Sequence, residues 1–148
     1  MATFSSTHQT TLSVPLPPAE ARAAWADPQR QARCRPELAS HEVPGPGLLR
    51  LRMKEMKHGP TAFTADYTLR FSEEGDRLLW RSLPGGSPQV EGSARFQAAP
   101  GGSTVTYEER VSVTMELGVV AAKLLRPIVE AMMERGMKGF VERMAASL

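Results

Sequence analysis

Residues 118–148 read GVVAAKLLRPIVEAMMERGMKGFVERMAASL and are predicted to form one long helix, Val119–Leu148. Two apolar rows and one charged row recur at every fourth position, so each row lies along one face of a helix. The apolar rows are Leu124, Ile128, Met132, Gly136, Phe140, Met144 and Leu125, Val129, Met133, Met137, Val141, and the charged row is Arg126, Glu130, Glu134, Lys138, Glu142. Such a helix is not stable alone, so its apolar side needs a covering surface, while the charged row is expected in water.

The covering surface is predicted from residues 40–115, where turn signals recur regularly. The turn clusters lie at 44–47, 58–60, 73–76, 84–88 and 100–102. The segments between them are roughly 9–12 residues long and alternate apolar with polar side chains, most clearly across Phe63–Phe71. Short connections favour antiparallel neighbours, and a single apolar face indicates a sheet that is covered on one side. These residues therefore predict a six-stranded meander.

The N-terminal segment predicts one more strand and two short helices. Residues 3–14 alternate in the same way and are expected to form a strand with one half-buried face. Pro18 suits the first turn of a helix over residues 19–26, and Asp27 suits the N-cap of a second helix that begins at Pro28. Because the apolar faces of sheet and long helix must pack together, the predicted class is α+β.

Composition narrows the function classes. The 148 residues suit a single domain, 1–148, and the net charge of +2 comes from a near balance of charges. No stripe of Lys and Arg with interleaved aromatics is present, so nucleic acid is not an expected partner. The single cysteine, Cys34, rules out a disulfide within the chain and fits a cytoplasmic location. No signal peptide is predicted, and no apolar run approaches the roughly 20 residues of a membrane span.

Residues 14–43, VPLPPAEARAAWADPQRQARCRPELASHEV, resemble the opening signature of the START/Bet v 1-like superfamily (SRPBCC), also called the polyketide cyclase/dehydrase and lipid-transport group. The matching features are Pro17 and Pro18 after the first strand, Trp25 on the first helix, the pair Asp27-Pro28, Pro36, and Glu42 at the entry to the second strand. Residues 101–107, GGSTVTY, match the usual entry to the last strand of this family. The resemblance spans the whole chain and concerns the fold more than the chemistry.

The resemblance implies a helix-grip fold. In this fold a bent, seven-stranded antiparallel sheet wraps around the C-terminal helix, with two short helices between strands one and two and a cavity between sheet and helix. Members of the superfamily bind lipids, sterols, polyketides or other apolar ligands, and some are cyclases or aromatases. The superfamily has no shared catalytic residue, so the resemblance assigns none to this chain.

Three polar residues on inward-facing positions are candidates for chemistry. Parity places His8 with the apolar residues of the first strand, and it places Tyr107 and Glu109 with those of the last strand. Because the helix-grip arrangement makes these strands antiparallel neighbours, His8 is expected near Glu109. Three interpretations stay open: the groups act as acid and base, they orient a polar group of a ligand, or His8 and Glu109 satisfy each other. Glu55 shares an inward parity, but a nearby turn favours its exposure.

The predicted ligand-binding residues are the apolar side chains expected between sheet and helix. They are Phe63, Tyr67, Trp80, Phe96, Tyr107, Val111, Met132, Met133, Gly136 and Phe140. Either Trp80 or Arg81 is inward-facing, and Trp80 suits an apolar pocket better. The many methionines favour a pocket that adapts to its ligand, because methionine is flexible and polarizable. Gly136 either makes room for a ligand or permits close approach to the sheet.

Three functions fit these observations. The first is a carrier or sensor that binds a small hydrophobic ligand (a lipid, polyketide-like or aromatic compound), which is favoured because inward polar residues are few. The second is a cyclase- or dehydratase-like enzyme that uses acid and base groups in the cavity. The third is a protein-interaction module with a filled core, although the four-residue apolar repeat and Pro127 argue against a coiled coil.

Neither a metal nor another cofactor is predicted. His8, His41 and His58 fall on three different segments and do not form a spaced pair of metal ligands. The oligomeric state stays open between monomer and homodimer, because a sheet of this kind leaves an exposed edge.

Overall fold

The computed structural model describes residues 1–58 and 61–148. Its strands are β1 (Ala2–Val14), β2 (Leu38–Glu42), β3 (Leu48–Met53), β4 (Met56–His58), β5 (Thr61–Phe63), β6 (Asp66–Glu74), β7 (Arg77–Ser82), β8 (Gln89–Ala99) and β9 (Gly102–Met115). Its helices are α1 (Pro18–Trp25), α2 (Pro28–Arg33) and α3 (Val119–Ala146). Gly59 and Pro60 belong to a predicted turn that lies partly outside the described residues.

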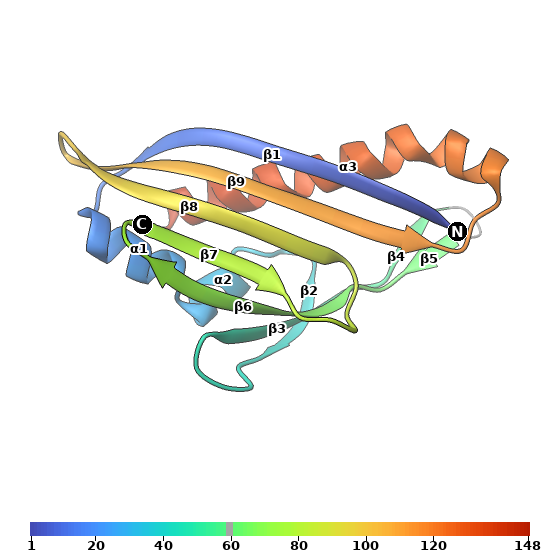
Figure 1. The fold of residues 1–148 in the computed structure, drawn as a ribbon, viewed down its shortest axis with the longest axis horizontal. Coiled ribbons are helices and arrows are strands. Elements are labelled where there is room, and N and C mark those ends of the chain that lie inside the picture. Colours follow the sequence, from blue (N-terminus) through green and yellow to red (C-terminus); the bar gives the residue numbers. More distant parts are fainter. Residues whose placement is uncertain (59–60) are drawn as a thin grey trace.

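Seven strands form one antiparallel sheet in the order β1-β9-β8-β7-β6-β3-β2. Helix α3 runs along the sheet beside β1 and β9, while α1 and α2 lie at the end of the molecule opposite to β4 and β5 (Figure 1). The seven-stranded sheet, the long C-terminal helix and the two short helices between β1 and β2 confirm the predicted helix-grip architecture.

Local sequence explains how α2 begins and how β8 turns into β9. The Asp27 carboxylate accepts a hydrogen bond from the backbone N–H of Gln29 at 3.2 Å, and Pro28 occupies the first turn, as predicted. Gly102 has a φ of 155° at the start of β9. A Cβ atom at this position would overlap the carbonyl oxygen of Val14, so only glycine allows β9 to start this close to the end of β1.

One predicted strand is divided in two. The alternation across Phe63–Phe71 predicted a continuous strand, but β5 and β6 are separated at residues 64–65, and β3 and β4 are separated at residues 54–55. At this point the backbones of Asp66 and Ser87 exchange hydrogen bonds of 2.8 and 3.1 Å. Beyond this point β4 and β5 pair only with each other, outside the main sheet.

The first apolar row of α3 changes its surroundings along the helix. Phe140 and Met144 are buried, whereas Leu124 is 70% exposed and Ile128 is 41% exposed. A step of four residues turns a helix of 3.6 residues per turn by about 40°, so this row rotates by roughly 200° between residues 124 and 144. The expectation that the sheet covers the whole row is therefore wrong for its N-terminal part.

The charged row of α3 partly faces strand β1 instead of water. The Glu130 carboxylate accepts a hydrogen bond from the backbone N–H of Ser5 at 2.9 Å, and the Arg126 guanidinium donates to the carbonyl oxygen of Thr3 at 2.7 Å. Strand β1 is an edge strand of the sheet, so these backbone groups lie on an edge that no other strand pairs with. Helix α3 thus covers an edge that would otherwise offer unpaired groups to another chain.

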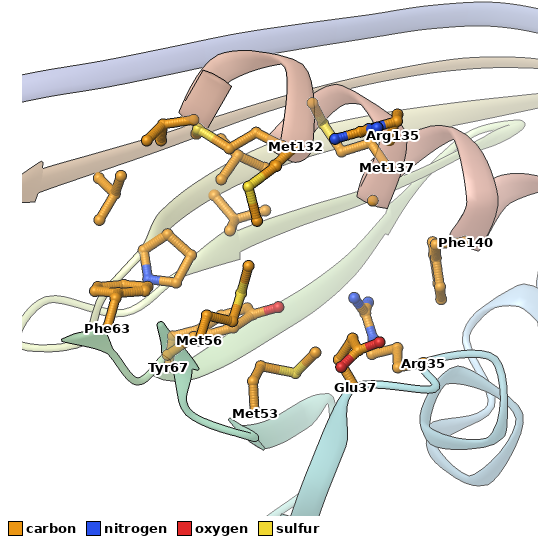
Figure 2. Close-up of a pocket in the computed structure, with 18 of the residues that line it drawn as sticks. Arg35, Glu37, Met53, Met56, Phe63, Tyr67, Met132, Arg135, Met137 and Phe140 are labelled. Carbon is orange, nitrogen blue, oxygen red and sulfur yellow. The ribbon is translucent and has the colours of Figure 1, made fainter. Parts of the chain in front are cut away.

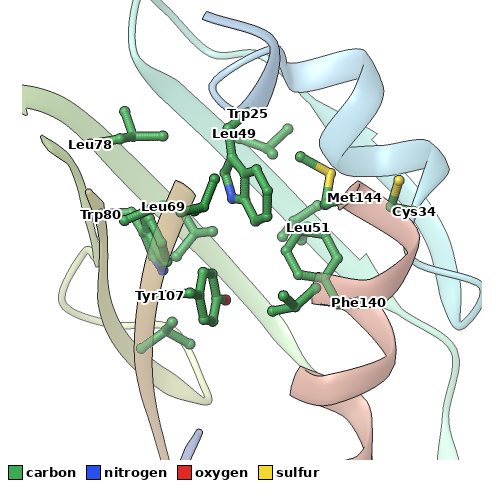
Figure 3. Packing of buried hydrophobic residues seen from close by; sticks show 14 of the residues in the cluster. Trp25, Cys34, Leu49, Leu51, Leu69, Leu78, Trp80, Tyr107, Phe140 and Met144 are labelled. Carbon is green, nitrogen blue, oxygen red and sulfur yellow. The ribbon is translucent and has the colours of Figure 1, made fainter. Parts of the chain in front are cut away.

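The core consists of two clusters. The larger cluster packs the sheet against α1 and the C-terminal half of α3, with Trp25, Tyr107 and Met144 among its buried residues (Figure 3). The smaller cluster joins Phe4 and neighbouring residues of β1 and β9 to the N-terminal half of α3. The second half of α3 is therefore held by the main core, and the first half by a much smaller set of contacts.

Candidate functional site

A cavity of about 470 Å³ lies between the inner face of the sheet and α3 (Figure 2). Its walls come from β3 to β6, β8, β9, residues 125–143 of α3 and the segment that links α2 to β2. The cavity reaches the surface between these last two elements and the β4–β5 hairpin, because Glu37, Met56 and Arg135 line it and are also exposed. The volume lies within the range of roughly 300–1,000 Å³ that is typical of small-molecule sites.

The wall is mostly apolar and rich in methionine. Six of the eight methionines of the chain line it, namely Met53, Met56, Met115, Met132, Met133 and Met137. Met53 and Met115 face inward because they share the apolar parity of their strands, and Met56 of β4 pairs with Phe63 of β5. The methionines of α3 lie on its two apolar rows. Methionine side chains rearrange at low cost, so this wall can adapt to apolar ligands of different shape.

Seven of the ten predicted ligand-binding residues line the cavity. They are Phe63, Tyr67, Val111, Met132, Met133, Gly136 and Phe140. A Cβ atom on Gly136 would meet nothing within 4 Å, so this glycine leaves open space and does not serve close packing on the sheet.

Trp80, Phe96 and Tyr107 do not line the cavity, which corrects the expected position of these three rings. They are buried with Trp25 in the neighbouring core (Figure 3). Ring centroids are 5.4 Å apart for Trp80 and Tyr107, and 6.0 Å apart for Trp25 and Phe96. The four aromatic rings therefore fill this end of the sheet with each other. Trp80 is buried and Arg81 is exposed, in line with the sequence-based preference.

Three residues that are neighbours across β7, β8 and β9 determine the position of the Glu109 carboxyl group at the cavity. The register pairs Glu109 of β9 with Gly92 of β8, and Gly92 with Trp80 of β7. A Cβ atom on Gly92 would overlap the Trp80 ring, so the indole can cross β8 only because this residue is glycine. The indole N–H then donates to Glu109 Oε2 at 2.7 Å. Glu109 is only 6% exposed, yet it lines the cavity.

Burial raises the pKa of Glu109 above its usual range. The positive charge of Arg35 and the hydrogen bond from Trp80 oppose this rise, because both favour the carboxylate. Burial and the nearby Glu109 carboxyl raise the pKa of Tyr107 well above its usual value. The Tyr107 hydroxyl itself lacks hydrogen-bond geometry to any group in the described residues. Glu109 is thus a carboxyl group that can hold a proton beside an apolar space.

The structure brings His8 next to Glu109 in the sheet but not into the cavity. The register pairs these two residues across β1 and β9. The His8 imidazole does not line the cavity, and its Nδ1 lies 3.6 Å from Oε1 of Glu134 on α3. The ring centroids of His8 and Tyr107 are 6.5 Å apart. Of the three candidate residues, only Glu109 therefore contacts the cavity. Glu55 is exposed and lies outside it, as expected.

Sequence reasoning missed the arginines of the cavity. Arg35, Arg135 and Arg143 all line it. The Arg35 guanidinium carbon lies 4.0 Å from the centroid of the Phe140 ring, and its Nη2 donates to Gln31 at 2.9 Å. A signal for two of them was present, because residues 135 and 143 are eight apart and so share one face of α3. No signal marked Arg35, which follows α2 and reaches the cavity only through the fold.

Metal ligands and membrane-spanning helices are also absent from the described part of the chain. No group of three or more His, Cys, Asp or Glu side chains converges there. None of the helices in residues 1–58 and 61–148 combines the length and hydropathy needed to cross a bilayer.

A family model described as polyketide cyclase/dehydrase and lipid transport matches residues 3–148. The chain belongs to this family. The match covers every helix and nearly every residue of the sheet. Family and fold together support a role in ligand binding or cyclisation.

Solved structures of this fold resemble the family member described here at low sequence identity. The Zhui aromatase/cyclase from Streptomyces sp. R1128 aligns with a TM-score of 0.64 and 14% identity, over 99% of this chain and 93% of that chain. The protein TTHA0849 from Thermus thermophilus aligns with a TM-score of 0.60 and 20% identity, over 97% of this chain and 98% of that chain. Ara h 8.0201 aligns with a TM-score of 0.61 and 16% identity, over 97% of each chain. A search of curated proteins returned no significant match.

Proposed function

We propose that this polyketide cyclase/dehydrase and lipid-transport family member binds a small hydrophobic ligand between its sheet and α3, as a carrier or sensor. The observation that carries the proposal is the apolar cavity of about 470 Å³. Burial of apolar ligand surface in such a space is favourable by roughly 25 cal/mol per Å² before the costs of association. Because methionine side chains adapt their shape, the methionine-rich wall favours binding of a class of apolar ligands over binding of a single compound.

A second candidate function is that of a cyclase- or dehydratase-like enzyme. It is favoured by Glu109, whose buried carboxyl group lines the cavity and whose pKa is raised by burial. A buried carboxyl group with a raised pKa can deliver or accept a proton. The enzyme needs a second group that exchanges protons with the substrate, and His8 and Tyr107 stand outside the cavity wall. Tyr67 does line the cavity, but burial raises the pKa of its hydroxyl and disfavours its ionised form. We therefore favour the carrier or sensor.

Binding of the neutral probe N-phenylnaphthylamine tests the proposal, since its fluorescence rises in apolar surroundings. Met132→Trp should fill the cavity and weaken binding by about tenfold or more, because Met132 is part of the wall. Ile128→Trp is the matched control, since Ile128 lies one turn earlier on α3, is 41% exposed and is not part of the wall. Absence of binding to the wild-type protein, or equal loss in both variants, would count against a ligand in this cavity and favour an interaction module.

A further inference from the structure

We infer that the ligand is an anionic amphiphile, with an apolar body in the cavity and a carboxylate head held by Arg35. This inference rests on the proposed function and adds the chemistry of the head group. It comes from the arrangement of charge around an otherwise apolar space, which determines what kind of apolar ligand is preferred.

Arg35 is the central residue. Its side chain is half-buried, lines the cavity and packs its guanidinium over the Phe140 ring at 4.0 Å. Figure 2 shows the guanidinium pointing from the segment before β2 toward α3. The bond to Gln31 uses one nitrogen, Nη2, and the buried Nε has no hydrogen-bond partner in the described residues. A buried donor without an acceptor is costly, and an incoming carboxylate would supply the acceptor.

The other cations of the wall point to the same head group. Within the described residues, no carboxylate lies within 4.0 Å of the guanidinium of Arg35, Arg135 or Arg143. Arg50, by contrast, is paired with an acidic side chain, because it donates two hydrogen bonds of 3.0 and 2.9 Å to the Asp66 carboxylate. Arg143 does donate its Nε to the carbonyl oxygen of Cys34 at 2.7 Å, but no acidic side chain neutralises any of the three guanidinium groups in the described residues.

Two acidic residues also line the cavity and set the position of the head group. Glu37 is exposed, on the same short segment as Arg35, and Glu109 is buried beside Trp80. A carboxylate beside Glu109 would meet a buried acid, whereas one on the side of the exposed residues Glu37 and Arg135 meets the half-buried guanidinium of Arg35. The head group therefore belongs at the rim, where water is also available, and the apolar body extends inward. Arginine suits a carboxylate because its planar fork matches the two oxygens.

The test compares ligands that differ only in the head group. Dodecanoate, methyl dodecanoate and dodecanol should each compete with N-phenylnaphthylamine at neutral pH. We expect dodecanoate to bind the wild-type protein roughly tenfold or more tightly than the ester or the alcohol, as a charge-assisted hydrogen bond predicts. Arg35→Gln should remove most of this preference while changing ester binding by less than about threefold. Arg33→Gln is the control, because Arg33 is an exposed arginine on α2 that does not line the cavity.

The outcomes separate the two proposals. Equal affinity for acid and ester, with the probe still bound, would overturn the anionic head group and leave the proposed function intact. A preference for the acid that survives in Arg35→Gln but falls in Arg33→Gln would overturn the role of Arg35. If Arg35→Gln does not fold, the wild-type ratio measured at low salt and at about 1 M salt still decides, since screening should shrink a preference that depends on charge.

Discussion

Trp80 and Glu109 are joined by a hydrogen bond of 2.7 Å although a whole strand lies between them. The indole crosses β8 above Gly92 and reaches the carboxyl group from the core side, while the cavity borders the same carboxyl group. This contact therefore connects the aromatic core to the candidate site. It gives Glu109, the buried acid among the described cavity residues, a hydrogen-bond donor on its core side.

Replacement of Glu109 should change how stability depends on pH. Burial raises the pKa of Glu109 in the folded protein above the ordinary value of 4.5, so the folded state binds more protons than the unfolded state above that pH. The contribution of Glu109 to stability therefore falls as pH rises from about 4.5 to the folded pKa, and then stays low. Glu109→Gln should be more stable than wild type at about pH 8 and lose this advantage at about pH 5, as measured by urea unfolding. A difference that grows toward low pH would contradict the sign.

Removal of the indole N–H tests the same contact from the other side. Trp80→Phe leaves Glu109 without its hydrogen-bond donor in a buried place, so the free energy of unfolding should fall by about 1–3 kcal/mol beyond the loss of ring area. The same change in a Glu109→Gln background should cost less, because an amide is cheaper to leave unpaired than a charge. Equal costs in both backgrounds, in a double-mutant cycle, would mean that the hydrogen bond contributes nothing measurable.

Two glycines should respond to alanine in opposite ways. Gly136→Ala should stabilise the protein by about 0.5–1 kcal/mol, because Gly136 lies inside α3 and a Cβ atom would meet open space. Gly92→Ala should destabilise it by roughly 1–3 kcal/mol, because the Cβ atom would collide with the Trp80 ring. Thermal unfolding of the two variants measures both effects, and a stabilised Gly92→Ala would refute the packing described for Trp80.

The cover of the β1 edge can be measured at Glu130. Glu130→Ala removes the acceptor for the backbone N–H of Ser5, and we expect a loss of about 1 kcal/mol in the free energy of unfolding. It should also increase self-association at high concentration, since the sheet edge becomes available for pairing. Glu142→Ala is the control, because Glu142 is an exposed glutamate of the same helix that lies twelve residues beyond Glu130. Equal behaviour of the two variants in unfolding and in sedimentation would argue against a protective role.

Much of the fold could be predicted because it depends on the order of residues along single elements. The inward parity of Val105, Tyr107 and Glu109 follows from alternation, and the start of α2 follows from Asp27 and Pro28. These signals are local, and one buried face fixes which parity points inward. The same reasoning found seven residues of the cavity wall, because strand parity and helix rows select apolar side chains that meet there.

The remaining errors share a physical cause, which is that side chains choose partners on other elements. His8 pairs with Glu109 in the sheet as expected, but its imidazole lies near Glu134 of α3 and does not line the cavity. Trp80 was expected in the cavity, but Gly92 on the neighbouring strand opens a path into the core. Arg35 gave no signal, because its contact with Phe140 joins residues that are far apart in the chain. Such contacts depend on how helices and strands pack against each other in space. The periodicity of apolar residues along one element contains no information about that packing.

The rotation of the apolar row along α3 divides the helix into two units of unequal stability. Residues 137–146 contribute Phe140, Val141 and Met144 to the main core, so their amide hydrogens should exchange with solvent only when the whole protein unfolds. Residues 119–133 rest on the small cluster and on the edge of β1, and Pro127 has no N–H to donate within the helix. Their amides should exchange faster, through partial opening of the helix. Such opening would uncover the cavity while the sheet stays folded, so bound ligand could be exchanged at a cost well below that of global unfolding.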